Sequence, residues 1–97
     1  MKLTLLQAIA LVEKVDALFD KAARAWERGN NSGNSEQLAR GEALCEQYRK
    51  EAEALLAPLG IAVDYPGLYP SFTVRGYSHH STVSAVSAAM ELEGCHV

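Results

Sequence analysis

The stretch Gly29-Asn30-Asn31-Ser32-Gly33-Asn34 lies between two long segments whose apolar residues recur with helical spacing. Glycine and asparagine tolerate the left-handed backbone conformation that ends helices and forms tight turns, and asparagine is also a strong helix N-cap. The stretch therefore predicts the end of one helix, a flexible turn and the cap of the next. Because the connection is short, the two helices are expected to form a long antiparallel hairpin.

The first helix is predicted over residues 4–28. Thr4-Leu5-Leu6-Gln7 has the pattern of a capping box, in which the Thr4 and Gln7 side chains each bond the other residue's backbone N–H. The apolar residues that follow are three and four positions apart, and they are Ala8, Leu11, Val12, Val15, Leu18, Phe19, Ala22 and Trp26. This spacing is typical of a helix with one buried face.

The second helix is predicted over residues 35–57. One side of it carries Leu38, Gly41, Cys45, Tyr48, Ala52 and Leu55. Glycine inside a helix is destabilising by about 1 kcal/mol relative to alanine. We therefore expect Gly41, together with the small residues Cys45 and Ala52, to let the first helix approach closely.

Pro58 and Gly60 end the hairpin, and a short β-element with an aromatic loop is predicted over 61–80. Its first part, 61–65, has the alternation of a short strand. Residues 72–74 and 77–79 then read as a small β-hairpin around a turn at Arg75-Gly76, in which Gly76 supplies a positive φ.

A short C-terminal helix is predicted over 81–93, capped by Ser81 or Thr82 and with Val83, Val86 and Met90 on one face. A strand over 82–87 is the alternative, but strand alternation would put the two valines on opposite faces. The fold class expected is mostly α (α+β), as a single domain over 1–97. A domain of this size buries a modest core, so self-association as a homodimer is also expected.

The formal net charge of −3 and the pI near 5.5 argue against a protein that grips nucleic acid through its phosphates, which requires a concentrated positive surface. The sequence shows no apolar run of the ~18–20 residues needed to span a membrane. It also shows no cleavage-like site of a secretory signal. A cytoplasmic location is therefore expected. The two cysteines, Cys45 and Cys95, do not make a disulfide framework.

The segment from Leu59 to Met90 is nearly free of charge and rich in aromatic residues. Its charged residues are Asp64 and Arg75, although charged residues make up 22% of the chain. This composition is typical of a surface that a partner or the protein's own helices cover. The candidate partner-binding residues are Tyr65, Leu68, Tyr69, Phe72, Arg75 and Tyr77. Alternatively, Tyr65, Leu68, Tyr69 and Phe72 cover the open face of the helical hairpin, and the two interpretations are compatible.

Weak candidates for metal ligands are His79, His80, Cys95 and His96, joined by Cys45, because imidazole and thiolate suit zinc and copper. Their spacing matches no metal motif, so no cofactor is predicted. Ser78, Ser81 and Asp64 lie close to the two histidines in sequence, but no pattern of a nucleophile elbow surrounds them. An enzymatic role is therefore disfavoured.

The leading hypothesis is a small non-catalytic protein-interaction module that acts by occupying the surface of a partner protein. Its small size without a catalytic motif is typical of accessory or inhibitor proteins of phages and mobile elements. The alternative is a small metal-binding or hydrolytic protein that uses His79 and His80.

Overall fold

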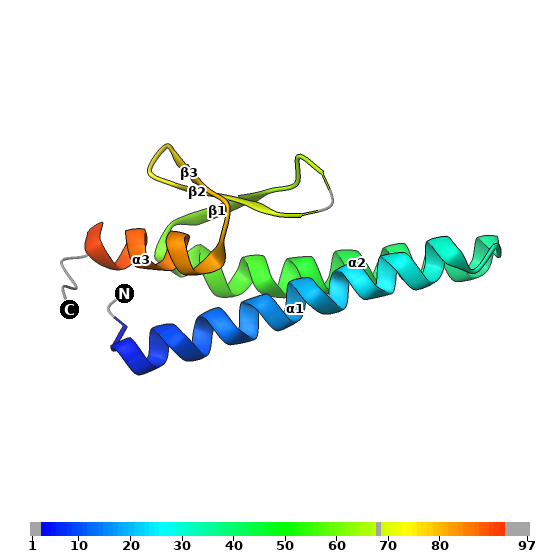
Figure 1. Cartoon of the computed structure of the whole chain (residues 1–97), viewed down its shortest axis with the longest axis horizontal. Coiled ribbons are helices and arrows are strands. Elements are labelled where there is room, and N and C mark those ends of the chain that lie inside the picture. The colour runs from blue at the N-terminus through cyan, green and yellow to red at the C-terminus, as the bar shows by residue number, and fades with distance from the viewer. Residues whose placement is uncertain (1–2, 68, 93–97) are drawn as a thin grey trace.

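The computed structural model describes residues 3–67 and 69–92. Its elements follow the order α1 (Leu5–Asn31), α2 (Ser35–Leu56), the 3-10 helix η1 (Ala57–Leu59), β1 (Ile61–Asp64), β2 (Ser71–Val74), β3 (Tyr77–His79) and α3 (Thr82–Leu92). The expected mostly helical α+β fold with a long helical hairpin is confirmed (Figure 1). The sheet and α3 lie over the end of the hairpin where α1 begins, and the end with the α1–α2 turn projects beyond them (Figure 1).

The predicted capping box starts α1. The Gln7 N–H donates to Thr4 Oγ1 at 3.1 Å, and the Thr4 N–H donates to Gln7 Oε1 at 2.9 Å. These two bonds satisfy backbone donors that otherwise have no partner inside the helix. Thr4 is therefore the N-cap, and α1 itself begins at Leu5, one residue after the start of the predicted range.

The end of α1 differs from the prediction. The helix runs to Asn31, three residues past the expected end at 28, and Gly29 is a buried helical residue. Its role is packing, since a Cβ added to Gly29 would lie 2.9 Å from the Gln37 carbonyl oxygen. The turn comes later, at Gly33 with a φ of +69°. Asn34 then caps α2 as predicted, accepting from the Glu36 and Gln37 N–H groups at 2.9 and 3.2 Å.

The two helices approach closely at Gly41, as predicted. A Cβ on Gly41 would lie 2.6 Å from the Ala25 carbonyl oxygen and 3.0 Å from Gly29 Cα. Real Cβ atoms do not come that near to backbone, so the helices meet here with no room for a larger side chain. The small residues stand on both helices, Ala25 and Gly29 on α1 and Gly41 on α2.

The β-element is a three-stranded antiparallel sheet in the order β1-β2-β3. Phe72 pairs with Val63 on one side and His79 on the other, and Val74 pairs with Ile61 and Tyr77. The Arg75-Gly76 turn has positive φ at both residues, 48° and 86°, so Arg75 shares the conformation predicted for Gly76 alone. This is the turn geometry that matches the twist of a tight hairpin.

The sheet buries one face against the helices. Phe72, Val74 and Ile61 are buried there with Val15, Leu56 and Val86. Phe72 meets Phe19 of α1 edge to face, with ring centroids 5.9 Å apart. The other face carries the small or polar residues Ala62, Asp64, Thr73 and Ser78, which are exposed or half-buried. The open face of the sheet is therefore not aromatic.

Ser81 caps α3, as one of the two predicted options. Its hydroxyl accepts from the Ser84 N–H at 3.1 Å, and Thr82 instead donates its hydroxyl to Asp16 of α1 at 2.7 Å. The predicted shared face was wrong at Val83, which is 57% exposed. The buried positions Ala85, Val86, Ala89 and Met90 make a stripe that Val83 lies beside. The predicted helix end at residue 93 lies outside the described residues.

Within 3–67 and 69–92, no helix is both long enough and apolar enough to cross a membrane.

Candidate functional site

The predicted aromatic segment divides into buried and exposed side chains. Phe72 is 1% exposed and belongs to the core, whereas Tyr69 and Tyr77 are 76% and 75% exposed. Tyr65 is half-buried and Arg75 is exposed. Leu68 lies outside the described residues. The segment thus contributes both to the closure of the core and to the surface, the combination that the sequence left open.

The exposed members of this segment lie at the two ends of β2. Tyr69 precedes the strand in the β1–β2 loop, and Arg75 and Tyr77 flank the turn that follows it. A four-residue strand is about 13 Å long. Tyr69 borders a hollow of about 290 Å³ that His80 and Val83 also line, at the start of α3. The exposed side chains of Val83 and Tyr69 therefore lie near each other at this hollow.

The two candidate histidines have different surroundings. His79 is half-buried and its Nδ1 lies 2.7 Å from the Ser84 hydroxyl, whereas His80 is exposed beside the hollow near Tyr69. Sequence reasoning had named Ser78 and Ser81 as possible partners and missed Ser84. In the described part of the chain, no three His, Cys, Asp or Glu side chains gather as metal ligands would. Cys95 and His96 fall outside that part.

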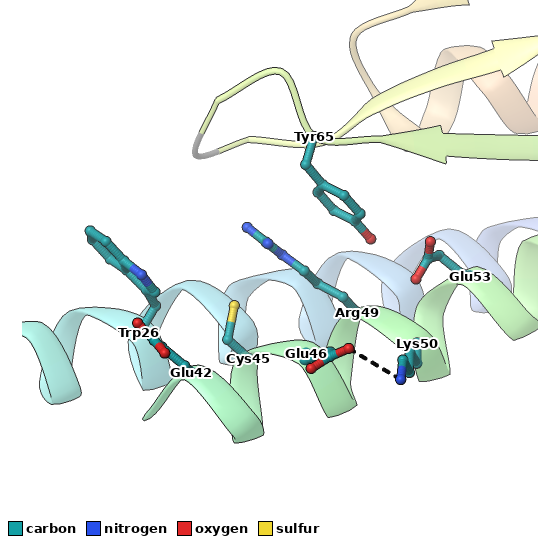
Figure 2. A pocket seen from close by; sticks show the side chains of 8 residues that line it. All are labelled: Trp26, Glu42, Cys45, Glu46, Arg49, Lys50, Glu53 and Tyr65. Carbon is teal, nitrogen blue, oxygen red and sulfur yellow. Dashed lines mark ion pairs between the residues drawn. The ribbon is translucent and has the colours of Figure 1, made fainter. Parts of the chain in front are cut away.

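A second site, which the sequence analysis did not predict, is a cleft of about 550 Å³ between the helical hairpin and the β1–β2 loop. Its inner wall is formed by Trp26 of α1, Cys45 and Arg49 of α2, and Tyr65 after β1 (Figure 2). Four further charged residues of α2 line it, and they are Glu42, Glu46, Lys50 and Glu53. Cys45 is buried at 3% exposure, and Trp26 remains 36% exposed.

Arg49 is held in this cleft by an aromatic ring. Its guanidinium carbon lies 4.2 Å from the centroid of the Tyr65 ring, within the range of a cation–π contact. Figure 2 shows the side chain extending from α2 toward the loop, beside Tyr65 and facing the space next to Trp26. The Phe19 ring supports Tyr65 from α1, with centroids 6.4 Å apart. Among the described residues, the guanidinium is therefore positioned by packing on the ring and not by a carboxylate.

Tyr65 itself carries an unsatisfied polar atom. Its hydroxyl is buried and makes no hydrogen bond of good geometry with any described residue, although the Glu53 carboxylate lies on the same side of the ring (Figure 2). Burial raises the pKa of the Tyr65 phenol well above its ordinary value, and the negative charge of Glu53 raises it further. The phenol therefore stays protonated at neutral pH and keeps a hydrogen to donate.

The cleft joins residues from three separate segments, so spacing along the chain gave no sign of it. One signal was present in the sequence. Trp26 is the single tryptophan of the chain, and it lies near the C-terminal end of the apolar stripe of α1, which finishes at Gly29. A large aromatic ring at that position has few core residues left to cover it.

Comparisons with models of known protein families, with curated proteins and with solved structures found no match to this chain.

Proposed function

We propose that the chain is a non-catalytic module that acts by occupying the surface of a partner protein, with Tyr69, Arg75 and Tyr77 among the residues in contact. The observation that carries the proposal is the exposure of both tyrosines, about three quarters of each side chain. Tyrosine and arginine are enriched among the residues that dominate binding energy at interfaces.

The setting of these side chains supports the proposal. The strand between Tyr69 and Arg75 is fixed to the core through Phe72 and Val74, which are 1% and 2% exposed. An aromatic side chain next to a fixed strand loses little conformational freedom when it binds. The small size of the protein fits an accessory or inhibitor protein of a phage or mobile element that acts in the cytoplasm. The identity of the genes on either side of its own gene would test this role.

The experiment is affinity purification of tagged full-length protein from the native host, followed by quantitative mass spectrometry. We expect Tyr69→Ala and Arg75→Ala to lose a partner that the wild type retains, with unchanged circular dichroism and melting. Gln47→Ala, at an exposed position on the outer face of α2, is the control and should retain it. A partner kept by both variants, or variants that unfold, would contradict the proposal.

We also propose that two copies of the chain associate through the start of α1. Leu5, Leu6 and Ile9 are 53%, 80% and 48% exposed and are neighbours on the first turns of that helix. Sedimentation analysis should find a dimer for the wild type and a monomer for Leu6→Glu. A wild type that sediments as a monomer at high concentration would exclude this association.

A hydrolytic role is the second candidate, favoured by the His79–Ser84 hydrogen bond, in which the imidazole could accept the hydroxyl proton. Among the described residues, the His79 ring hydrogen-bonds to Ser84 alone, and no carboxylate bonds the ring as the orienting acid of a triad does. Activity toward an activated ester that disappears in Ser84→Ala would promote this candidate over partner binding. Elemental analysis of protein purified without chelators would test its metal-dependent form.

A further inference from the structure

We infer that the cleft between Trp26 and Tyr65 receives a carboxylate of the partner protein, from an Asp or Glu next to an aromatic residue, with the carboxylate on Arg49 and the ring on Trp26. This inference rests on the proposed function and names a contact beyond those of Tyr69, Arg75 and Tyr77.

The first argument is the state of Arg49. Three other cations on the two long helices pair with a carboxylate one helical turn away, Arg24 with Asp20, Arg40 with Glu36 and Lys50 with Glu46, at 3.0 to 3.2 Å, whereas Lys14, Lys21 and Arg28 form no ion pair among the described residues. Arg49 has Glu53 four residues after it rather than before it, which is the less favourable order for a helical ion pair. Within residues 3–67 and 69–92 Arg49 forms no ion pair or hydrogen bond. It stacks on Tyr65 instead.

An arginine in this state is prepared for an anion. The guanidinium presents five N–H donors in a planar fork that fits a carboxylate with two parallel hydrogen bonds. Stacking on an aromatic ring fixes the plane without using those donors. The half-burial of Arg49 also lowers the local dielectric, which strengthens a charged hydrogen bond relative to one in water.

The cleft is lined by three carboxylates and two cations, so an anion is favoured at Arg49 itself and not over the rest of the cleft. Glu46 is paired with Lys50 at 3.2 Å, and Glu53 lies on the hydroxyl side of Tyr65. Glu42 is exposed and lies at the Trp26 end of the cleft (Figure 2). A cationic group entering beside Tyr65 would find the ring face already occupied by Arg49 and would be repelled by it.

Trp26 supplies the second half of the specificity. Its indole ring forms the opposite wall and is 36% exposed, so an aromatic ring can stack on it and cover the buried thiol of Cys45. Tryptophan, tyrosine and arginine are the three residue types most enriched at the centres of protein interfaces. The open shape and charged rim of the cleft suit a side chain carried by a protein.

The test uses full-length ¹⁵N-labelled protein and two short peptides, acetyl-Asp-Phe-amide and its neutral counterpart acetyl-Asn-Phe-amide. Because the chain has one tryptophan, its single indole N–H signal in a ¹H–¹⁵N spectrum reports on the cleft. We expect the Asp peptide to shift this signal with an affinity roughly tenfold higher than the Asn peptide, as charge-assisted hydrogen bonds are stronger than neutral ones. The preference should weaken with added salt.

Arg49→Gln should remove the preference, and Arg49→Lys should retain a reduced one, because lysine keeps the charge but not the planar fork. Arg40→Gln is the control, since it removes an equivalent arginine that is already paired. Circular dichroism of each variant checks the fold. Equal affinity for the two peptides, no shift with either, or a preference that survives in Arg49→Gln would overturn the inference. Tighter binding of acetyl-Lys-Phe-amide would do so too, and would assign the cleft to a cation beside Glu42.

The two proposals fail separately. If the peptides show no preference while Tyr69→Ala and Arg75→Ala still lose the partner, the partner-binding function stands and the carboxylate contact is wrong. If the peptides behave as expected but those variants keep the partner, the cleft binds a carboxylate and the surface around β2 is not the interface.

Discussion

Gly41→Ala is the sharpest test of how the helical hairpin is held together. In an exposed helix this substitution stabilises by about 1 kcal/mol, because alanine has the higher helix propensity. Here the added Cβ would lie 2.6 Å from the Ala25 carbonyl oxygen and 3.0 Å from Gly29 Cα. Both obstacles are backbone atoms, which cannot turn aside as a flexible side chain can. The helices must therefore move apart over the adjoining buried residues.

Overpacking of this kind costs about 1–3 kcal/mol even where side chains can adjust. The backbone contact places Gly41→Ala at the upper end, and the gain in propensity offsets part of the loss. We expect a net decrease in the free energy of unfolding of about 2 kcal/mol, or roughly 8–16 °C in melting temperature for a domain of this size. Urea unfolding followed by circular dichroism measures the first quantity.

Ala43→Gly is the matched control, because Ala43 is exposed on the same helix and reports the propensity difference alone. It should lose about 1 kcal/mol. If Gly41→Ala instead stabilised the protein by a similar amount, the helices would not be in backbone contact at this position, and the packing argument would be refuted.

Three further pairs of substitutions test the core, the α1–α3 contact and the cleft. Phe72→Ala should lower the free energy of unfolding by about 3–5 kcal/mol because Phe72 is 1% exposed. Tyr77→Ala should change it by less than about 0.5 kcal/mol because Tyr77 is 75% exposed. Thermal melts of the two variants measure the difference. Thr82→Val should lose about 1–2 kcal/mol by breaking the hydrogen bond to Asp16, and a double-mutant cycle with Asp16→Ala should show that the two losses are not additive. Tyr65→Phe should be neutral or stabilising at pH 7, because it removes a buried hydroxyl that makes no hydrogen bond of good geometry with the described residues. The pKa of the Tyr65 phenol is higher in the folded protein than in the unfolded chain, where it is near 10. The contribution of this group to the free energy of unfolding is therefore constant below about pH 10 and is lost as the pH rises further. Tyr65→Phe should flatten this alkaline decline in stability, whereas Tyr69→Phe should not.

Local signals predicted most of the fold. The capping box at Thr4 and Gln7, the cap at Asn34 and the positive φ at Gly76 each depend on a few adjacent residues, and each is present as expected. Gly29 was misread because a glycine before two asparagines looks the same whether it ends a helix or meets a neighbouring backbone. The partner helix at Gly41 decides between the two, and it lies outside the local pattern.

Distance along the chain explains what sequence reasoning missed. Val83 was predicted to share one face of the helix with Val86 because it is three residues earlier. That spacing fits two different buried stripes, and the position of the sheet decides between them. The cleft needs Trp26, Arg49 and Tyr65 together, and no spacing rule links residues so far apart. Arg49 alone looks like an ordinary solvated charge on a helix with Glu53 one turn away.

The end of the hairpin that projects past the sheet offers a practical handle. Gly33 has open space around the position of a Cβ, and the bonds that finish α1 and begin α2 are made by its neighbours Ser32 and Asn34. A fluorophore or short epitope inserted directly after Gly33 would leave both of those bonds in place. It would also sit on the far tip of a molecule 50 Å long, well clear of the strands and of α3, so that labelled protein could report on binding without blocking it.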